Sequence, residues 1–448
     1  MRQFGLERQR NAICSALMRF PLFLVFLFGW SAYGQSTYAL RAARMFDGKS
    51  DGPVQPGIVI VDGNSIRAIG GPAPTGATVI DLGDATLLPG FIDAHTHLTM
   101  DFNPDYNGQR LENLTRTIPE QSIRSTANAR VTLMAGFTTV RDVGSSSFMD
   151  VGLRNAINSG IVPGPRMLVA VHALGSTGGH CDEGDGFRFG LLNHESRPED
   201  GVINSPEEAE YAVRFNVKYG ADVIKSCPTG GVLSPTDDVD APQLTQAEMN
   251  TIVAIAHELH RKTAAHAHAP EGAKRAIRAG IDSIEHGTFL DDEALRMMRE
   301  HGTYLVPTLS VRSGIAESKF PPFVRQKADL AIRSQDSMVR RALAAGVKIA
   351  LGTDAAVYPH GDNALEFVLL CADGMTPAQA LRAGTSAAAD LLGLQGKIGT
   401  LEAGKLADIV AVPGNPLEDI KVTQSVVFVM KEGKIYRNDR SGASTKGL

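Results

Sequence analysis

The sequence predicts an α/β protein: a (β/α)₈ TIM barrel that carries a small β-sandwich built from the N- and C-terminal segments. Aliphatic strand-like segments alternate with amphipathic helical segments through the middle of the chain, which is typical of βαβ units and a parallel sheet. Eight such strands can be counted, and eight is the number that closes this kind of barrel. Short alternating strands separated by Gly, Asp and Asn turns occupy both ends of the chain.

The N-terminus, residues 1–34, is expected to be a signal peptide. An apolar run of about eleven residues follows a basic stretch and ends in small residues at Ala32 and Gly34. The run is too short to span a bilayer comfortably and no second apolar span follows, so a retained membrane anchor is the less favoured alternative. Met18 directly precedes Arg19 and the apolar run, which leaves open whether translation begins at Met1 or at Met18. We expect a secreted or periplasmic protein with no stable membrane partner after the leader is removed.

The composition is that of a globular protein, with 43% hydrophobic and 21% charged residues. Removing residues 1–34 takes away four Arg and one Glu, so the net charge falls from −5 to about −8. No basic face is left for nucleic acid. Cys181, Cys227 and Cys371 remain, which is too few for a disulfide scaffold, although one bridge is possible.

The β-sandwich is expected to combine residues 35–88 with residues 393–440, and residues 441–448 are expected to form a flexible tail. The barrel then spans residues 89–392. Its strand candidates are residues 86–95, 137–144, 166–174, 221–227, 262–268, 281–287, 303–309 and 347–354. Helices fit between them, for example at residues 205–220, where Ser205 is a candidate N-cap and Glu208 follows three residues later.

Chemically capable side chains occur where these strands end. Side chains alternate between the faces of a strand, so His95 and His97 point the same way and can share one ligand. The active site of such a barrel is assembled from the C-terminal ends of its strands. The residues at these ends are His95 and His97 (first strand), Lys225 (fourth), His266 (fifth), His286 (sixth) and Asp354 (eighth).

Imidazole and carboxylate together indicate a divalent first-row metal such as zinc, held in a site with open positions. Lys225 conflicts with this interpretation, because an ammonium group repels a cation. The conflict disappears if the deprotonated amine has captured carbon dioxide to become a carbamate, an anionic ligand whose two oxygens can bridge. Two divalent metal ions then become feasible, with N6-carboxylysine at Lys225.

At these residues the chain resembles the amidohydrolase superfamily, and within it the secreted members similar to imidazolonepropionase and to Xaa-Pro dipeptidases, ochratoxinase-like amidases included. The resemblance covers essentially the mature chain, and its motifs are specific only in combination: GNSIRAIG, PGFIDAHTHL, AGFTTVRDVG, GADVIKSC, AAHAHAPEGAKRAIRAGIDSIEHG, LGTDA and GTLEAGKLADIVAV. It implies that His95 and His97 hold the more buried ion and that carboxylated Lys225 bridges. It also implies that His266 and His286 hold the second ion, with Asp354 close enough to ligate and to move protons.

These parts predict amide hydrolysis. Two ions would share a bridging hydroxide, because metals lower the pKa of water, and the outer ion would polarise the scissile carbonyl. Asp354 would take the proton of the attacking hydroxide and pass it to the leaving amine. His286 and His268 are further candidate catalytic residues. His268 shares a face with His266 and could be the ligand in its place, or it could contact the substrate or support a ligand.

The substrate-binding residues are harder to predict. In dipeptidases of this resemblance a substrate carboxylate must be held, which makes Arg141, His180, Tyr358 and His360 candidates. A structural role is open for each, and Arg141 could form an internal pair with Asp142. The expected partner is a small-molecule amide or dipeptide, and a symmetric homo-oligomer is the default expectation.

The predicted reaction is therefore cleavage of the amide bond of a dipeptide, Xaa-Pro-like, or of an N-acyl amino acid such as an ochratoxin-like amide. Hydrolysis of a cyclic amide, as in imidazolonepropionase, remains an alternative, against which the secretory leader argues mildly. A metal-free binding or assembly module is an alternative of another class. Such a module would have lost one or more of the ligands, and all six are present.

Overall fold

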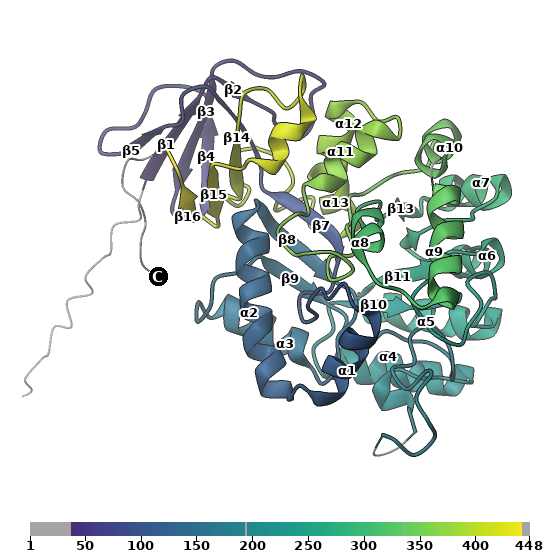
Figure 1. The fold of residues 1–448 in the computed structure, drawn as a ribbon. Coiled ribbons are helices and arrows are strands. Elements are labelled where there is room, and N and C mark those ends of the chain that lie inside the picture. Colours follow the sequence, from purple (N-terminus) through teal and green to yellow (C-terminus); the bar gives the residue numbers. More distant parts are fainter. Residues whose placement is uncertain (1–36, 193–194, 336, 441–448) are drawn as a thin grey trace, which may run out of the picture. The chain divides into compact units, whose positions relative to one another are not determined.

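The computed structural model describes residues 37–192, 195–335 and 337–440, and in these residues it is an α/β protein (Figure 1). The expected signal peptide, residues 1–34, and the expected tail, residues 441–448, lie outside the described residues. None of the described helices combines the length and the apolar character that crossing a membrane requires.

Parallel strands in the middle of the chain form two sheets, with strand orders β7-β8-β9 and β10-β11-β12-β13. The strands are β7 (Phe91–Thr96), β8 (Phe137–Asp142), β9 (Arg166–Val169), β10 (Val223–Ser226), β11 (Lys262–Ala267), β12 (Ser283–His286) and β13 (Tyr304–Val306). Isolated parallel bridges lie beyond the edges of these sheets. They join Leu174 to Ser226, Leu305 to Ile349, and Thr96 to Ala355.

The predicted eighth strand, residues 347–354, is wrong as a regular strand. This segment bonds to its neighbours only at separate positions: the amide of Ala94 donates to the carbonyl of Leu351 at 2.9 Å, and the amide of Asp354 donates to the carbonyl of His95 at 2.8 Å. Asp354 has a left-handed backbone, with φ 59°, which ends any extended ladder at the position where the side chain is used.

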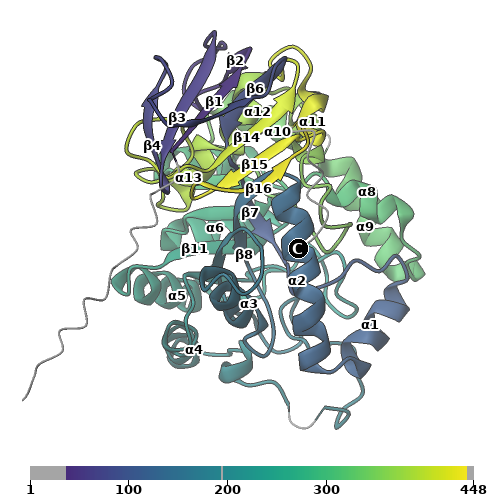
Figure 2. The same ribbon diagram turned by 90° about the vertical axis from the view of Figure 1, so that its left-hand side faces the viewer.

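The two ends of the described chain share a sheet. β14 pairs antiparallel with β6, with Ile409 opposite Pro89, and the strand order of this sheet is β16-β15-β14-β6-β2 (Figures 1 and 2). A second sheet has the order β4-β3-β1-β5. One hydrophobic cluster, which includes Leu40, Val59, Leu87 and Phe428, draws buried residues from both sheets.

The strands of these terminal sheets are β1 (Thr37–Ala42), β2 (Arg44–Met45), β3 (Gly57–Asp62), β4 (Ser65–Ile69), β5 (Thr78–Asp81), β6 (Ala85–Pro89), β14 (Ile409–Pro413), β15 (Phe428–Lys431) and β16 (Lys434–Asn438). The single strand predicted at residues 86–95 is therefore two strands, which belong to different sheets. They are divided at Gly90, where a Cβ atom would lie 2.1 Å from the Oγ1 atom of Thr138, so no larger residue fits the turn.

The helices follow the predicted alternation. They are α1 (Tyr106–Thr115), α2 (Ile118–Met134), α3 (Met149–Asn158), α4 (Pro206–Lys218), α5 (Gln246–Glu258), α6 (Pro270–Ala279), α7 (Asp292–His301), α8 (Val311–Glu317), α9 (Pro322–Gln335), α10 (Met338–Ala345), α11 (Leu365–Ala372), α12 (Pro377–Ala383) and α13 (Ser386–Leu391), with short 3₁₀ turns at Pro198–Asp200 and Ile420–Gln424. The predicted N-cap of α4 is confirmed, because Ser205 accepts a hydrogen bond from the amide of Glu208 at 3.2 Å.

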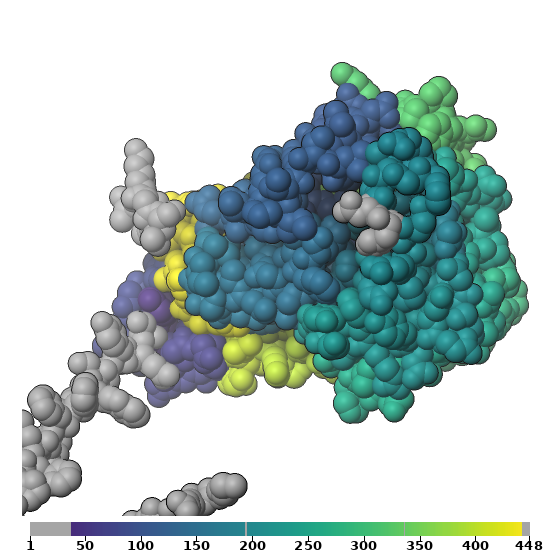
Figure 3. Space-filling model, turned by 90° about the horizontal axis from the view of Figure 1, so that it is seen from below, coloured from purple at the N-terminus to yellow at the C-terminus, as the bar shows by residue number. Residues whose placement is uncertain are grey.

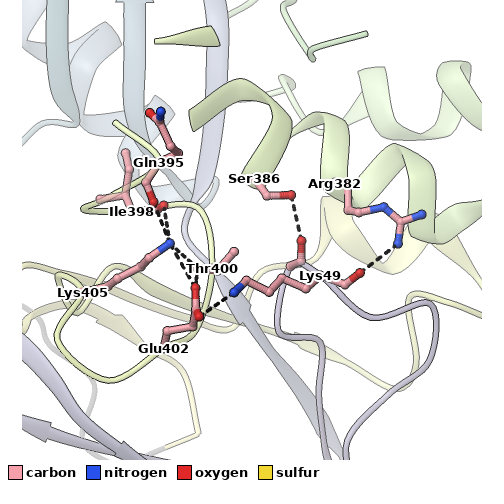
Figure 4. A pocket seen from close by; sticks show the side chains of 9 residues that line it. Lys49, Arg382, Ser386, Gln395, Ile398, Thr400, Glu402 and Lys405 are labelled. Atoms are coloured by element: carbon pink, nitrogen blue, oxygen red, sulfur yellow. Dashed lines mark hydrogen bonds and ion pairs between the residues drawn. The ribbon is translucent and has the colours of Figure 1, made fainter. Parts of the chain in front are cut away.

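A cavity of about 570 Å³ lies between the loop after β2, the helices α12 and α13, and the loop before β14 (Figure 4). Its charged side chains bind one another: Lys49 Nζ lies 2.5 Å from Glu402 Oε1, and Lys405 Nζ lies 3.2 Å from Glu402 Oε2. Ser386 Oγ donates to the carbonyl of Gly48 at 2.7 Å. These bonds hold the loop after β2 against α13 and against the loop before β14. None of the predicted site residues lines the cavity.

Three buried aromatic rings pack where the first parallel strands begin. The ring centroid of Phe91 lies 5.5 Å from that of Phe137 and 4.9 Å from that of Phe367, and all three side chains are fully buried. Because Phe367 belongs to α11, this contact joins α11 to β7 and β8.

Replacing Phe367 by Ala is expected to lower the free energy of unfolding by about 3–5 kcal/mol, because loss of a fully buried ring leaves a cavity. The matched control is Phe189→Ala, since Phe189 is 86% exposed. Its effect should stay within about 0.5 kcal/mol. Urea unfolding followed by circular dichroism measures both variants, and equal losses would contradict the importance of the aromatic cluster.

Candidate metal centre

The structure brings the predicted ligands together. Ring centroids of His95 and His286 are 5.0 Å apart, those of His95 and His97 are 5.5 Å apart, and those of His266 and His286 are 4.6 Å apart. Asp354 Oδ1 lies 3.4 Å from His95 Nε2 and 3.3 Å from His97 Nε2. Side chains that are far apart in the sequence therefore meet at the C-terminal ends of the parallel strands.

A buried ion pair orients His95. The Nδ1 atom of His95 lies 2.8 Å from Glu285 Oε2, and Glu285 Oε1 accepts a hydrogen bond from Arg141 at 2.8 Å. Neither Glu285 nor Arg141 has any exposed side-chain surface. Burial raises the pKa of Glu285, but Arg141 and His95 outweigh burial and lower it to about 2. An ionised Glu285 accepts a hydrogen bond from the Nδ1–H group of His95, so the lone pair of Nε2 is free to bind a metal ion.

Other rings are oriented in the same manner. His97 Nδ1 lies 3.0 Å from the carbonyl of Gly144, so this nitrogen donates and Nε2 carries the lone pair. His286 Nδ1 lies 2.8 Å from Thr308 Oγ1. Fixing one ring nitrogen leaves the other directed at a metal site, which is the arrangement that metal-binding histidines ordinarily show.

Two overlapping groups have the geometry to hold a cation. One combines His266, His268 and His286, and the other combines His95, His286 and Asp354; within each group the ligand atoms lie within 4.8 Å of one another. The donor set of imidazole nitrogens and a carboxylate oxygen fits a divalent first-row metal. Both His266 and His268 face the cluster, so the choice of ligand between them stays a prediction.

Three residues around these groups have left-handed backbones. The φ angles are 69° for His286, 51° for Thr308 and 59° for Asp354. Such conformations are costly for residues other than glycine, and they gather at functional sites where the surrounding structure enforces them. At His286 the effect is specific: Glu285 and His286 are neighbours in the chain, yet both contact His95, which regular alternation along a strand would forbid.

Four imidazoles at this site, those of His180, His266, His268 and His286, are held neutral. Burial is the main cause, and it lowers the pKa of His268 to about 3 and that of His180 to about 4. The pKa values of His266 and His286 are lowered well below their usual range by burial and by neighbouring imidazoles. Neutral imidazole is the form that binds metal ions, so the cluster is prepared for a cation at neutral pH.

Asp354, in contrast to these neutral imidazoles, is held in its charged form. Burial raises its pKa, but His95, His97 and His286 outweigh burial and hold it well below its usual range. The same contact raises the pKa of His97 against the effect of burial. Asp354 is therefore an ionised carboxylate, with 14% of its side chain exposed, which can ligate a metal or accept a proton.

Lys225 lies inside the cluster and not in solvent. It is 3% exposed, and burial lowers its pKa to about 8, although Glu285 and Asp354 act in the other direction. At pH 7 roughly a tenth of such an amine is neutral, far more than for an ordinary lysine. The neutral amine is the nucleophile that carbamate formation requires.

Arg141 is the predicted substrate residue that needs correction. Its guanidinium is fully buried. It donates hydrogen bonds to the carbonyl of Ala94 at 2.5 Å, to Ser283 Oγ at 3.1 Å and to Glu285. It is an internal pair, as one sequence alternative had it, but the partner is Glu285 and not Asp142. A fully buried arginine that is committed to these three partners is not placed to hold a substrate carboxylate.

The other predicted substrate residues stay predictions. His180 stacks on His266, with ring centroids 4.0 Å apart. His360 donates through Nε2 to the carbonyl of Met100 at 2.8 Å, and its Nδ1 is buried without a partner in the described residues. Tyr358 is 1% exposed, and no described residue gives its hydroxyl a hydrogen bond of ordinary geometry.

Two supporting residues, Glu285 and Thr308, were missed in the sequence. Glu285 directly precedes His286 in a fully buried strand, and an acid at a buried position signals a buried partner. The partner, Arg141, lies four strands earlier in the sequence, so the pairing becomes visible only in the fold. Thr308 carries no comparable signal.

Loops that follow the strands lie together on one face of the molecule (Figure 3). The blue segment that contains α1 and the teal segment that follows β9 come together there. Arg110 of α1 donates to the carbonyl of Asp185 at 2.9 Å, and its guanidinium lies 4.2 Å from the ring centroid of Phe187. The sequence left one disulfide possible, and the structure has one here, between Cys181 and Cys227, with 6.1 Å between the Cα atoms.

Buried imidazoles, a carboxylate and a buried lysine at the ends of parallel strands are a set of residues that suits metal-assisted hydrolysis. A model of the amidohydrolase family matches residues 86–436. The chain belongs to the amidohydrolase family, as the resemblance of its motifs indicated, and it is a hydrolase acting on C–N bonds.

The chain is also similar to individual proteins of known activity. It is 33% identical to ochratoxinase from Aspergillus niger over 381 residues, which cover 80% of this chain and 76% of the relative. It is 26% identical to imidazolonepropionase from Cutibacterium acnes, over 87% of this chain and 92% of the relative. A solved structure of a Xaa-Pro dipeptidase with methionine bound in the active site is similar with a TM-score of 0.84, at 41% identity, covering 90% of this chain and 100% of that one.

Replacing Glu285 by Gln is expected to lower the affinity for zinc about 10- to 100-fold, because the amide keeps the size but neither holds the Nδ1 proton of His95 as strongly nor neutralises Arg141. Competition with a chromophoric chelator measures the affinity. Glu210→Gln, which removes an exposed acid of α4, is the matched control. Unchanged affinity in the Glu285 variant would contradict its role as a support of the metal ligand.

Proposed function

We propose that this chain is a binuclear metal-dependent amidohydrolase that cleaves the amide bond of a dipeptide, Xaa-Pro-like, or of an N-acyl amino acid such as an ochratoxin-like amide. The observation that carries the proposal is the convergence of His95, His97, His266, His286 and Asp354 around buried Lys225. Similarity to a Xaa-Pro dipeptidase and to ochratoxinase supports the two substrate classes.

The proposed ligand set is the one that the resemblance implies. His95 and His97 would hold one divalent ion, and His266 and His286 would hold the other. Lys225, as N6-carboxylysine, would be a ligand to both, and zinc is the proposed metal. When bound, the two ions supply Lewis acidity that lowers the pKa of water and polarises a carbonyl.

The chain's own residues supply the proton transfers. Asp354 is ionised and partly exposed, so it accepts a proton from the attacking water and delivers it to the leaving amine. His268 is neutral, and its Nδ1 is held by Thr288 Oγ1 at 2.8 Å, which directs Nε2 away from Thr288 and makes it a candidate partner for the reacting carbonyl. His180, Tyr358 and His360 are the proposed substrate-binding residues.

The remaining proposals concern the whole chain. We propose a closed (β/α)₈ barrel at residues 89–392, supported by the isolated bridges between its sheets, and a β-sandwich of residues 35–88 and 393–440, supported by their shared hydrophobic cluster. A signal peptide at residues 1–34, secretion and a homo-oligomer are proposed on the sequence alone.

Metal analysis tests the centre. We expect about two zinc ions per chain, loss of activity on chelation, and loss of bound zinc in Lys225→Ala. Reconstitution of metal-free protein with zinc, at the same concentration of dissolved carbon dioxide, should be faster at about pH 8.5 than at about pH 6.5, because the neutral amine of Lys225 increases as the pH rises through its pKa of about 8. A Lys225→Ala variant with full metal content and full activity would contradict the bridge.

A substrate panel tests the reaction. Zinc-loaded protein is incubated with Xaa-Pro dipeptides, N-acyl amino acids and cyclic amides, and the released amine is quantified. We expect hydrolysis of one of the first two classes and none by Asp354→Asn, whose amide cannot accept the proton. Hydrolysis of cyclic amides alone would support the imidazolonepropionase-like alternative, and a metal-loaded chain inert toward the whole panel would refute the proposed function.

A further inference from the structure

His180 is enclosed more tightly than an exposed loop histidine would be. One face of its ring stacks on His266, at 4.0 Å between centroids. On another side it meets Gly231, where a Cβ atom would lie 2.0 Å from His180 Nδ1. Only glycine permits this approach, so the loop after β10 and the imidazole are fitted to each other.

A directional chain of hydrogen bonds starts at the ring. His180 Nδ1 lies 3.0 Å from Ser234 Oγ, and Ser234 Oγ donates to Asp237 Oδ1 at 2.6 Å. A hydroxyl has one proton to donate, and Ser234 donates it to the carboxylate of Asp237. Ser234 Oγ must therefore accept a hydrogen bond from His180. The ring therefore carries its proton on Nδ1 and its lone pair on Nε2, for which the described residues offer no hydrogen-bond partner.

Asp237 is held as an ionised, oriented acceptor. Its Oδ2 accepts from the amide of Gly231 at 3.1 Å and from Gln243 Nε2 at 2.9 Å. Burial raises the pKa of Asp237, but Ser234, His180 and Gln243 outweigh burial and lower it. A carboxylate with this many donors has one stable orientation, and Ser234 must then donate toward it.

Lys327 of α9 binds the same loop after β10. Its Nζ donates to the carbonyls of Gly231 at 2.8 Å and Ser234 at 2.7 Å, and it lies 3.2 Å from Asp237 Oδ1. Gln243 Oε1 in turn accepts from the amide of His180 at 3.0 Å. The backbone and the ring of His180 are thus fixed by one network that lies outside the metal ligands.

We infer that Ser234 and Asp237 are positioning residues for substrate binding, which fix His180 as the Nδ1–H tautomer so that Nε2 accepts a hydrogen bond from an N–H group of the substrate. The inference rests on the proposed function and deepens it. In a dipeptide with proline second, the peptide nitrogen carries no hydrogen, so the group recognised is the α-ammonium of the first residue. The enzyme then requires a free amino terminus, which favours dipeptides over N-acyl amino acids.

Ligand binding tests this without requiring hydrolysis. Calorimetry on zinc-loaded protein compares L-methionine with 4-(methylthio)butanoate, which lacks the ammonium group. The wild type should bind methionine about tenfold more tightly than the analogue, and Ser234→Ala and Asp237→Asn should lose that preference. Ser234→Thr keeps the hydroxyl and should retain the preference, as should Asp240→Asn, an exposed acid in the same loop.

A double-mutant cycle separates positioning from support of the fold. If Ser234 acts through His180, Ser234→Ala should have no further effect on methionine binding in a His180→Ala background. On a substrate from the panel, Ser234→Ala should raise KM about tenfold with kcat within about threefold, and zinc content and the unfolding midpoint should be unchanged.

Several results would overturn the inference: no preference for methionine in the wild type, full preference in Ser234→Ala, additive losses in the double mutant, or loss of zinc together with kcat. Failure of the proposed function is read separately, from the substrate panel and from the zinc content of the wild type.

Discussion

The ion pair of Glu285 and Arg141 is the interaction on which the site depends. A buried ion pair is costly to desolvate and is favourable only when its remaining donors and acceptors are also satisfied. Here Arg141 of β8 also donates to the carbonyl of Ala94 in β7 and to Ser283 of β12, and Glu285 of β12 accepts from His95. The pair ties three strands together from within, and the same carboxylate orients the first metal ligand.

Strain at the strand ends is the second constraint. Parallel strands bring their C-terminal ends to one side, but regular alternation would send every second side chain away from that side. Left-handed backbones at His286, Thr308 and Asp354 redirect these residues toward the cluster. The cost is offset by packing around them; at Gly352, for example, a Cβ atom would lie 2.3 Å from Val306 Cγ1 and 2.9 Å from His95 Cβ.

Chemistry and selectivity reside in different parts of the fold. The metal-binding residues stand on strand ends, and the chain shares its family with enzymes named for ochratoxin, imidazolonepropionate and Xaa-Pro dipeptides. The segment around His180 is instead loop structure, held by the Cys181–Cys227 disulfide, and Lys327 binds the neighbouring loop at Ser234. Loops of this kind can vary without disturbing the strands, so one hydrolytic centre can be combined with different substrates.

Local chemistry in the sequence was enough to determine the alternating elements, the Ser205 cap and the residues that gather at the strand ends, because strand periodicity and capping depend on near neighbours in the chain. It was not enough for Arg141, whose partner Glu285 comes from a distant strand, nor for the irregular segment at 347–354. Those outcomes depend on partners from distant strands and on backbone conformations that packing enforces, and such long-range contacts exist only once the chain has folded.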